Sequence, residues 1–530
     1  MYTARLKDIG LGLRATFFSR PKGGGYLESA ATAAAFGAPC WALVSITLLP
    51  LLAGHAPEWT PEGMRAEFPA LVGWVACAFV FGFLAHLLAD VIGSCPGAGE
   101  RPPAPAPPIT QRIVILGGGF AGVTTAQHLE HAFGADASVS MTLVSETNAL
   151  LFTPMLAEVA ASSLEPTHIS SPLRTGLRRT RVIRARASRI DLDRRCVELG
   201  APDGGELAFD HLVLAVGSVS NYLGLDGVER TALDFKTLGD AIRIRNRVID
   251  MFERADREAD PQRRRALLTF VVAGGGFAGA ELTGGLNDFA RGILVDYPHI
   301  PPDDLRVVLV HSRERILPEL SASLAAYALE RMAERGVTFK LNTRVVDARP
   351  GAVILNPQEE LLAETLVWTA GVRPNPLVEA LAVPRDRRGA VIVDTQLRIQ
   401  DQPGIWALGD CAMVNDGRTG QPCPPTAQFA LREAQTLAHN IHASVVGRPL
   451  RAFHFDALGT LCVVGHHTAC AEIKGLRFSG LFAWLLWRGI YLGKLPGLER
   501  KVRVLADWLI ELVFPRDIVQ TIDMSLGSER

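Results

Sequence analysis

The first hundred residues carry two long apolar runs. Residues 30–52 contain no charged side chain, and residues 69–93 are interrupted only by His86 and Asp90 near their end. Each run is long enough to cross the roughly 30 Å hydrocarbon layer of a bilayer as a helix. We therefore expect two transmembrane helices within residues 30–95. A cleaved signal peptide fits the first run poorly, because the basic segment before it is long and a second apolar run follows closely.

Charges beside the two runs predict their direction. The segment before the first run is basic, whereas the short loop between the runs is acidic. The charged residues concerned are Arg5, Lys7, Arg14, Arg20 and Lys22 before the first run, and Glu58, Glu62, Arg65 and Glu67 in the loop. Because basic flanks stay on the cytoplasmic side, residues 1–29 are predicted to form a cytoplasmic tail. The second run then returns the rest of the chain to the cytoplasm.

The pattern changes after the second run. A proline-rich linker is expected at residues 96–109, where the segment Arg-Pro-Pro-Ala-Pro-Ala-Pro-Pro favours an extended polyproline spacer. From residue 110 onward, short apolar strands alternate with helical stretches. That alternation predicts an α/β fold with parallel sheets.

A glycine motif follows the first of these strands, residues 112–116. Gly117, Gly119 and Gly122 have the G-x-G-x-x-G spacing and lead into a helical stretch. This is the dinucleotide fingerprint in its required context: the glycines allow a tight turn, close approach of a pyrophosphate, and close packing of helix on strand. The helix N-terminus would supply N–H donors to the phosphates. The predicted cofactor contacts in this unit are Gly117, Gly119, Phe120, Ala121, Gly122 and Glu146. Of these, Glu146 lies one residue beyond the usual ribose-binding position.

The same hexapeptide, Gly-Gly-Gly-Phe-Ala-Gly, occurs a second time. It follows the strand at residues 269–273 and places Gly274, Gly276 and Gly279 at the same spacing. Two such units in one chain imply two dinucleotides, usually a flavin and a nicotinamide. A duplication that binds nothing would not need all three glycines twice.

The two copies differ at two informative positions. Where the first copy has Thr124, the second has Glu281, which is either a carboxylate stabilised by the helix dipole or a group near the flavin–nicotinamide junction. At the end of the strand at residues 306–310, His311 stands where an acidic residue would favour NADH. The choice between NADH and NADPH therefore stays open.

Composition excludes several other classes of protein. The chain has 530 residues and a formal net charge of −1, so no basic excess points to nucleic acid. Its eight cysteines form no C-x-x-C pair and no Cys/His cluster, so no metal site is expected. A mean hydropathy of +0.18 agrees with membrane segments.

Further segments give the chain a family resemblance. They are Leu151-Phe152-Thr153-Pro154, Leu214-Ala215-Val216-Gly217, Trp368-Thr369-Ala370-Gly371, Ile405-Trp406-Ala407-Leu408-Gly409-Asp410 and Pro424-Pro425-Thr426-Ala427-Gln428. With the two glycine motifs, they resemble the type II NADH:quinone oxidoreductases, the non-proton-pumping alternative NADH dehydrogenases, from about residue 110 to the C-terminus. The resemblance implies a fold of two Rossmann-like domains that bind FAD and NADH, with NADPH as the other candidate donor. It also implies a membrane quinone as electron acceptor.

The resemblance assigns roles to individual residues. Thr153, Ala215, Gly217, Gly409 and Asp410 are expected at FAD, with Ala370 and Gly371 at the second crossover. Ala427 and Gln428 match the beginning of the family's Ala-Gln-x-x-x-Gln quinone motif, but Arg432 replaces the second glutamine. Glu281 and Gln428 are the predicted catalytic residues at the flavin. The implied segments are 110–235 and 376–450 for FAD, 236–375 for NAD(P)H, and 451–530 for membrane anchoring and quinone access.

The C-terminal region mixes tryptophan, leucine and basic residues over residues 480–514. Its apolar stretches are too short to cross a bilayer, and such mixtures suit amphipathic helices in the membrane interface. A dimer interface or a core helix is the competing interpretation, and a homodimer stays open. We expect the lipid bilayer as a partner.

The cysteines and the apolar runs also bear on alternative functions. Disulfide reductases of this fold need a C-x-x-x-x-C shortly after the first unit, and residues 145–169 contain no cysteine. A sulfide:quinone reductase needs cysteines near the flavin; Cys411 and Cys423 lie near the late FAD segment, whereas Cys196 is predicted in a surface hairpin. Transfer to a protein or sulfur acceptor, and a membrane-tethered flavin redox sensor, are the remaining alternatives.

Overall fold

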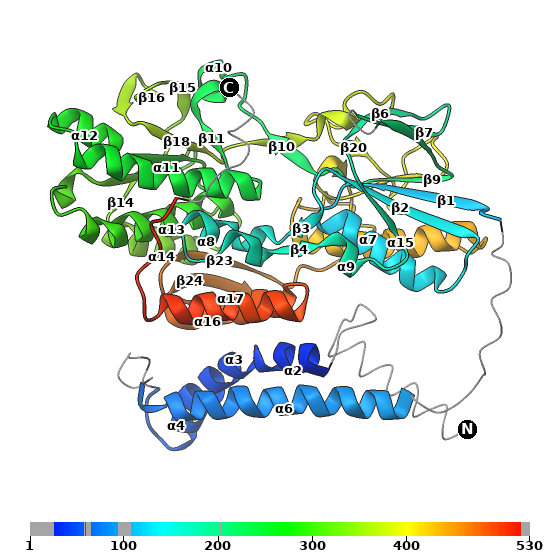
Figure 1. Ribbon diagram of the computed structural model, residues 1–530, viewed down its shortest axis with the longest axis horizontal. Coiled ribbons are helices and arrows are strands. Elements are labelled where there is room, and N and C mark those ends of the chain that lie inside the picture. Colours follow the sequence, from blue (N-terminus) through cyan, green and yellow to red (C-terminus); the bar gives the residue numbers. More distant parts are fainter. Residues whose placement is uncertain (1–25, 58, 60–64, 94–107, 201–203, 521–530) are drawn as a thin grey trace.

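The computed structural model describes residues 26–57, 59, 65–93, 108–200 and 204–520. Most of the predicted cytoplasmic tail and of the proline-rich linker therefore lies outside the described residues, as do the basic residues before the first apolar run. Two sheet-containing units form the upper body of the molecule, the C-terminal segment lies beneath one of them, and the N-terminal helices lie at the bottom (Figure 1).

The first unit is built on a five-stranded parallel sheet in the order β21-β9-β1-β2-β5. Its strands are β1 (Gln111–Leu116), β2 (Val139–Ser145), β5 (Arg181–Arg184), β9 (His211–Leu214) and β21 (Ile405–Ala407). β9 and β21 are buried along their whole length, as expected for strands with helices or other layers on both faces. Because β21 comes late in the chain, the first unit is built from segments that lie on both sides of the second unit in the sequence.

The second unit repeats this plan with the order β11-β18-β12-β13-β14. Its strands are β11 (Leu233–Asp234), β12 (Thr269–Ala273), β13 (Arg306–Val310), β14 (Val337–Lys340) and β18 (Thr365–Trp368). The chain passes between the two units through an antiparallel pair, β10 (Ser218–Ser220) and β19 (Val372–Pro374). The predicted α/β fold with two Rossmann-like units is confirmed.

Smaller antiparallel sheets extend both units. In the first unit this sheet comprises β6 (Ala187–Asp191), β7 (Cys196–Leu199) and β8 (Gly205–Ala208); in the second it comprises β15 (Val345–Arg349), β16 (Ala352–Leu355) and β17 (Glu359–Leu362). Cys196 is only 4% exposed, so its prediction as a surface hairpin residue is wrong: it begins β7 with its side chain turned into the protein.

The C-terminal segment forms a three-stranded antiparallel sheet followed by two helices. These are β23 (Gly459–Gly465), β24 (Thr468–Ile473), β25 (Leu476–Ser479), α16 (Gly480–Lys494) and α17 (Leu498–Glu511). β23 packs so closely on α13 (Phe277–Ile293) that a Cβ at Gly284 would lie 2.5 Å from the backbone of Val464. This packing joins the C-terminal segment firmly to the second unit.

The α17 helix has two apolar faces. Val504 and Trp508 are buried in the core, whereas Leu505, Leu509 and Ile510 are exposed. The helix is therefore a core helix on one side and presents apolar side chains outward on the other. The core-helix interpretation is confirmed for the buried side of α17, and the membrane-interface interpretation stays a prediction for its exposed side.

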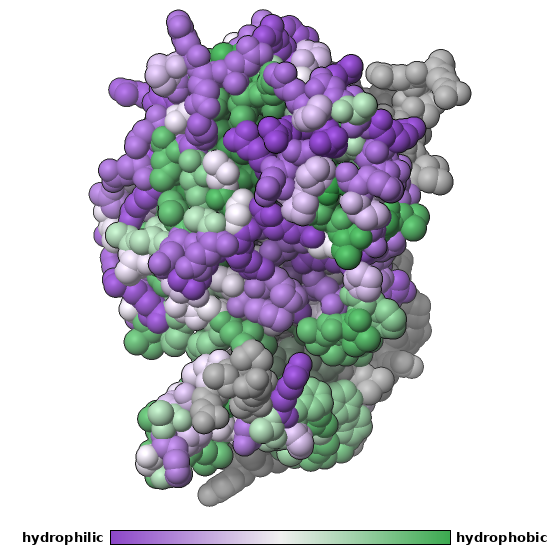
Figure 2. Space-filling view, turned by 90° about the vertical axis from the view of Figure 1, so that its left-hand side faces the viewer, coloured by the Kyte–Doolittle hydropathy of each residue, from purple (hydrophilic) through white to green (hydrophobic). Residues whose placement is uncertain are grey.

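The N-terminal helices form a hairpin beside α16 and α17 (Figure 1). Its first arm consists of α2 (Tyr26–Ala34), α3 (Gly37–Trp41), the π-helical η1 (Ala42–Leu48) and α4 (Leu49–Leu52), and its second arm is α6 (Phe68–Gly93). By length and composition, Ser29–Leu52 and Phe68–Leu88 are both candidate membrane spans. Figure 2 shows hydrophobic residues on this hairpin and on the adjacent end of the body, while the rest of that face is mostly hydrophilic.

Specific contacts hold the hairpin to the body. Pro39 packs on Gly489 of α16, where an added Cβ would lie 2.9 Å from the proline ring. Lys501 of α17 donates a hydrogen bond to Thr32 Oγ1 at 2.7 Å. Within the hairpin, His86 is buried and shares a hydrogen bond with Ser29 through Nδ1 at 2.7 Å, so it is part of the helix–helix contact.

Candidate active site

The first glycine motif forms a turn that only glycine fits. Gly117 has a φ of +114°, and a Cβ there would lie 2.1 Å from the Ala215 carbonyl oxygen. A Cβ on Gly122 would lie 2.0 Å from the Gly117 oxygen, whereas the Cβ direction of Gly119 is open for 4 Å. The turn thus leaves free space at the N-terminus of α7 (Phe120–Phe133), where a pyrophosphate would meet unbonded N–H groups.

The second motif has the same geometry. Gly274 has a φ of +117°, and a Cβ on Gly279 would lie 1.8 Å from the Gly274 oxygen. A Cβ on Gly276 would have only Glu319 Oε1 within 4 Å, at 3.9 Å. Both copies therefore retain an open nucleotide cradle at a helix N-terminus.

His311 stands directly beside the second cradle. Its Nδ1 accepts a hydrogen bond from the Gly275 N–H at 3.0 Å, which leaves the proton of the neutral ring on Nε2. Nε2 is buried and has no partner among the described residues. Burial, with Arg313 nearby, lowers the pKa of His311, so the ring is a neutral donor at neutral pH.

Asp410 is held in place by groups from three parts of the chain. Its Oδ2 accepts a hydrogen bond from Ser218 Oγ at 2.7 Å, and Lys236 Nζ donates to the same Ser218 hydroxyl at 2.5 Å. The preceding Gly409 N–H donates to Glu433 Oε2 at 2.8 Å. Burial lowers the pKa of Lys236 and raises that of Glu433 to about 7. The sequence did not predict Ser218 and Lys236, because the motif that they act on lies far away along the chain. Glu433 lies 24 residues after Gly409 but belongs to no motif that the sequence showed.

Glu281 lies on the first turns of α13 and faces the C-terminal sheet. Its Oε1 accepts the Val463 N–H of β23 at 3.3 Å. Burial raises the pKa of Glu281 to about 8, with a further contribution from the nearby Glu158. The carboxyl group is therefore largely protonated at neutral pH and can give up a proton.

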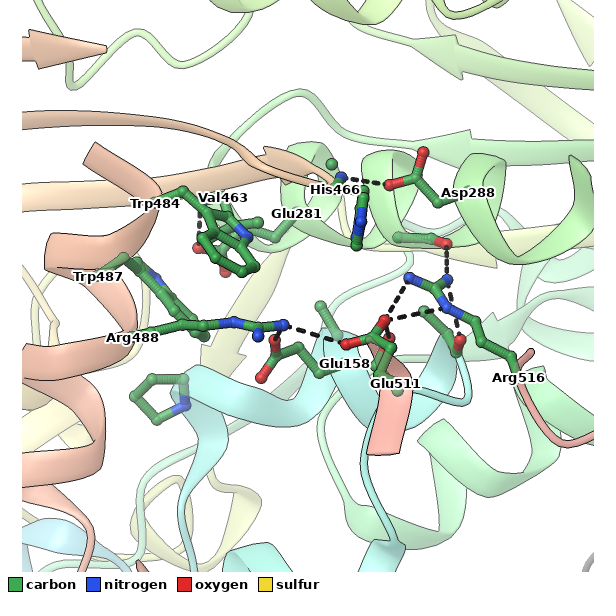
Figure 3. Close-up of a pocket in the computed structure, with 16 residues that line it drawn as sticks. Glu158, Glu281, Asp288, Val463, His466, Trp484, Trp487, Arg488, Glu511 and Arg516 are labelled. Carbon is green, nitrogen blue, oxygen red and sulfur yellow. Dashed lines mark hydrogen bonds and ion pairs between the residues drawn. The ribbon is translucent and has the colours of Figure 1, made fainter. Parts of the chain in front are cut away.

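A cavity opens in front of Glu281 (Figure 3). Glu158 from α8 (Leu156–Ala160), Trp484, Trp487 and Arg488 from α16, and Glu511 from α17 contribute to its walls. The cavity therefore lies where α8 and α13, which pack against each other, meet the C-terminal helices.

Gln428 stands at the start of α15 (Ala427–Val445), and its amide group is tied to the C-terminal segment. Its Nε2 donates to the Gly459 carbonyl at 3.3 Å, and its Oε1 accepts the Leu458 N–H at 3.4 Å. Arg432, one turn later, is exposed, with its guanidinium 5.5 Å from the centre of the Phe455 ring.

Comparisons with known proteins agree with this arrangement. Residues 111–434 match the family model "Pyridine nucleotide-disulphide oxidoreductase", and residues 458–517 match "NDH2 C-terminal domain". The type II NADH:quinone oxidoreductase Ndh of Mycobacterium tuberculosis is 31% identical over 79% of this chain and 91% of its own length. The chain belongs to the type II NADH:quinone oxidoreductases.

Two further likenesses support this membership. The demethylphylloquinone reductase of Synechocystis is 31% identical to this type II oxidoreductase over 75% of this chain and 95% of the relative. The solved structure of NDH2 from Plasmodium falciparum in complex with NADH has the same fold, with a TM-score of 0.72 and 18% identity. That likeness covers 77% of this chain and 99% of the other. The predicted family and enzyme class are confirmed, and the chain is a flavoprotein of the NADH:quinone oxidoreductase kind.

The site residues predicted for this type II oxidoreductase fall into two groups. Gly117, Gly122, Ala215 and Gly409 meet around the end of the first sheet, where a Cβ on Gly409 would touch Ala121 at 3.4 Å. Glu146 lies apart from them: its side chain is 65% exposed and 3.6 Å from Arg186. Ribose binding by Glu146 stays a prediction, as do the roles of Phe120, Thr153, Gly217, Ala370, Gly371 and Ala427.

The two cysteines near the late FAD segment of this oxidoreductase lack the features of reactive thiols. Cys411 is fully buried, and burial raises its pKa to about 12; burial also raises that of Cys423 to about 11. Both side chains are therefore neutral thiols at physiological pH, and a neutral thiol is a poor nucleophile. No cluster of three or more metal-ligating side chains occurs in the described parts of the chain.

Proposed function

We propose that this chain is a membrane-bound, FAD-dependent NAD(P)H:quinone oxidoreductase that does not pump protons. FAD is proposed in the cradle of Gly117, Gly119 and Gly122, and the nicotinamide in that of Gly274, Gly276 and Gly279. The chemistry that FAD would supply when bound is hydride acceptance from the nicotinamide and two-electron transfer to a quinone. The observation that carries the proposal is the pair of open glycine cradles, with the Glu281 carboxyl following the second.

The chain's residues have defined tasks in this proposal. Asp410, fixed by Ser218, would bind the ribityl side of FAD, and Lys236 would balance the charge there. Glu281 and Gln428 would face the reacting edge of the flavin. The proposed segments are 110–235 and 376–450 for FAD and 236–375 for NAD(P)H; the pairing of β21 with β9 supports the split FAD unit.

Membrane attachment is proposed through two elements. The hairpin of candidate spans would enter the bilayer, and the outward apolar side chains of α17 would lie in its interface. We propose that α17 faces lipid rather than a second copy of the chain, because the hairpin lies on the same side of the body (Figure 1). Charges before the first span favour a cytoplasmic body. Absence of pumping is proposed from the family to which the chain belongs, because the resemblance is to the non-proton-pumping alternative NADH dehydrogenases.

Anaerobic titration tests the proposal directly. Purified protein should contain FAD, should lose its flavin absorbance on addition of NADH or NADPH, and should recover it on addition of a soluble quinone. Running the two donors in parallel also settles the nicotinamide preference. Protein that contains no flavin, or whose reduced flavin is not reoxidised by quinone, would refute the proposed function.

A further inference from the structure

Quinone reduction needs a proton that the nicotinamide does not carry. In the proposed reaction, NADH, one proton and a quinone give NAD⁺ and a quinol, so each turnover takes one proton from the surroundings. Glu281 can give a proton, but it must be reprotonated before the next turnover. The inference below rests on the proposed function and concerns the source of that proton.

The cavity in front of Glu281 offers a path. It has a volume of about 40 Å³, enough for roughly two or three water molecules. Glu281 and Glu158 both line it, one from α13 and one from α8, which packs on α13 (Figure 3). Ser163 and Arg516 line it as well, and both are only half-buried. Water in this cavity would link the two carboxyl groups.

Arg488 binds two carboxylates unequally. Its guanidinium lies 3.1 Å from Glu511 Oε2 but 3.8 Å from Glu158 Oε1, and it stacks over Trp484 at 3.8 Å and over Trp508 at 4.6 Å. The two rings and Glu511 therefore fix the arginine and satisfy its charge. Glu158 receives only the weaker part of this interaction.

Glu511 is a permanent anion in this network. Arg516 contacts its Oε1 at 2.9 Å, and Ser163 Oγ donates to the same oxygen at 2.9 Å. These partners hold the pKa of Glu511 below its usual value in spite of burial. Glu158 has Trp508 Nε1 as its hydrogen-bond donor, at 3.4 Å, and burial raises its pKa to about 7. The two carboxyl groups beside Arg488 therefore differ in charge state: Glu511 stays ionised, whereas Glu158 can be protonated near neutral pH.

We propose that Glu158 is the proton carrier that reprotonates Glu281 through water in this cavity during quinone reduction. The other titratable and charged groups that face the cavity or pair with its lining are Asp288 of α13 with its partner Arg335, His466 and His467 between β23 and β24, Arg488 of α16, Glu511 of α17, and Arg516. Burial lowers the pKa of His466 to about 4, so this histidine is neutral and does not compete as the proton source.

The test separates proton-coupled from proton-free electron acceptance. Glu158→Gln should slow NADH oxidation by a soluble quinone about tenfold or more, because a carboxamide cannot carry the proton. With ferricyanide, which takes electrons without protons, the same variant should match the wild type. The wild-type quinone rate should fall as the pH rises through about 7, where Glu158 loses its proton, and this fall should be absent in Glu158→Gln.

Further variants distinguish carrying a proton from holding the fold. Glu158→Asp retains a titratable group and should restore most of the quinone rate and its pH dependence. Trp508→Phe removes the hydrogen bond that favours the Glu158 anion, so the midpoint of the pH profile should move upward. If Glu158→Gln fails to fold, Glu158→Asp and Trp508→Phe decide the matter alone. Infrared pH titration should show a protonated carboxyl band that is missing in Glu158→Gln.

The outcomes separate this inference from the proposed function. If the wild type fails to reduce quinone, the proposed function is lost. If the wild type reduces quinone and Glu158→Gln does so equally fast with an unchanged pH profile, Glu158 carries no proton. Equal slowing of the quinone and ferricyanide reactions would also overturn the inference, since it would indicate a purely structural role.

Discussion

At the residue scale, Gly276 and Gly279 of the second motif have separable tasks, and alanine substitutions distinguish them. Gly279→Ala places a Cβ 1.8 Å from the Gly274 oxygen, so we expect a loss of about 1–3 kcal/mol in the free energy of unfolding. Gly276→Ala meets only the far end of Glu319, so its stability should stay within about 0.5 kcal/mol of the wild type.

Gly276→Ala should instead raise the KM for NADH, because the added methyl group enters the space of the pyrophosphate. Urea denaturation and steady-state kinetics on the two variants check both expectations. Equal destabilisation by the two substitutions would contradict the assignment of the open position to the nucleotide.

A second residue-scale prediction concerns the donor. His311 presents a neutral Nε2–H that can donate to a ribose hydroxyl or to a phosphate oxygen. His311→Asp replaces this donor by an anion that accepts from the ribose and repels a 2′-phosphate. The ratio of kcat/KM for NADH over NADPH should rise about tenfold or more. An unchanged ratio would show that His311 does not face the ribose.

The sequence predicted those parts of the site that are encoded locally. Glycine spacing, the strand before it and the helix after it lie within about two dozen consecutive residues, so both cradles were predictable. Glu158 and Arg488 were not, because they meet only when segments about 330 residues apart pack together. Cys196 was misplaced for a related reason: the hairpin was recognised, but not the core that covers one of its faces.

At the scale of elements, the contact between the hairpin and α16 depends on one small residue. A side chain at Gly489 would collide with Pro39 at 2.9 Å and approach the Ala35 carbonyl at 3.3 Å. Gly489→Leu should therefore separate the hairpin from α16 and speed amide hydrogen exchange in residues 480–494, while β12 stays protected.

A matched control exists on another helix of the chain. Gly292 of α13 has nothing within 4 Å of its Cβ position, so Gly292→Leu should leave exchange in α16 unchanged. If Gly489→Leu also leaves it unchanged, the hairpin does not depend on this contact.

The apolar runs show how far composition determines an element. Both were long enough to predict helices, and both are candidate spans. The first arm nevertheless breaks after Ala34, resumes at Gly37 and passes through the π-helical η1. The break lets the arm bring Pro39 against α16, which is a tertiary requirement that hydrophobic length alone does not encode.

At the scale of the whole molecule, the hairpin and α17 should contribute separately to membrane binding. A variant that lacks residues 1–107 should still bind anionic liposomes through α17 and its basic residues, but release at high salt should become easier. The full chain should stay bound under the same wash, because apolar spans are insensitive to salt. Liposome sedimentation measures both, and equal release of the two proteins would contradict an anchoring role for the hairpin.

Under the proposed membrane attachment, the packing of Pro39 on Gly489 has a consequence for how long the enzyme would stay on the bilayer. Two anchors that are joined within one folded body must dissociate together before the protein leaves the bilayer. While one anchor is bound, the effective concentration of lipid around the other is high, so the other rebinds quickly. Residence time then grows roughly with the product of the two partition constants, not their sum. A modest interfacial helix coupled to the hairpin in this way would make the proposed attachment effectively permanent, so encounters with a lipid-soluble substrate would become collisions in two dimensions.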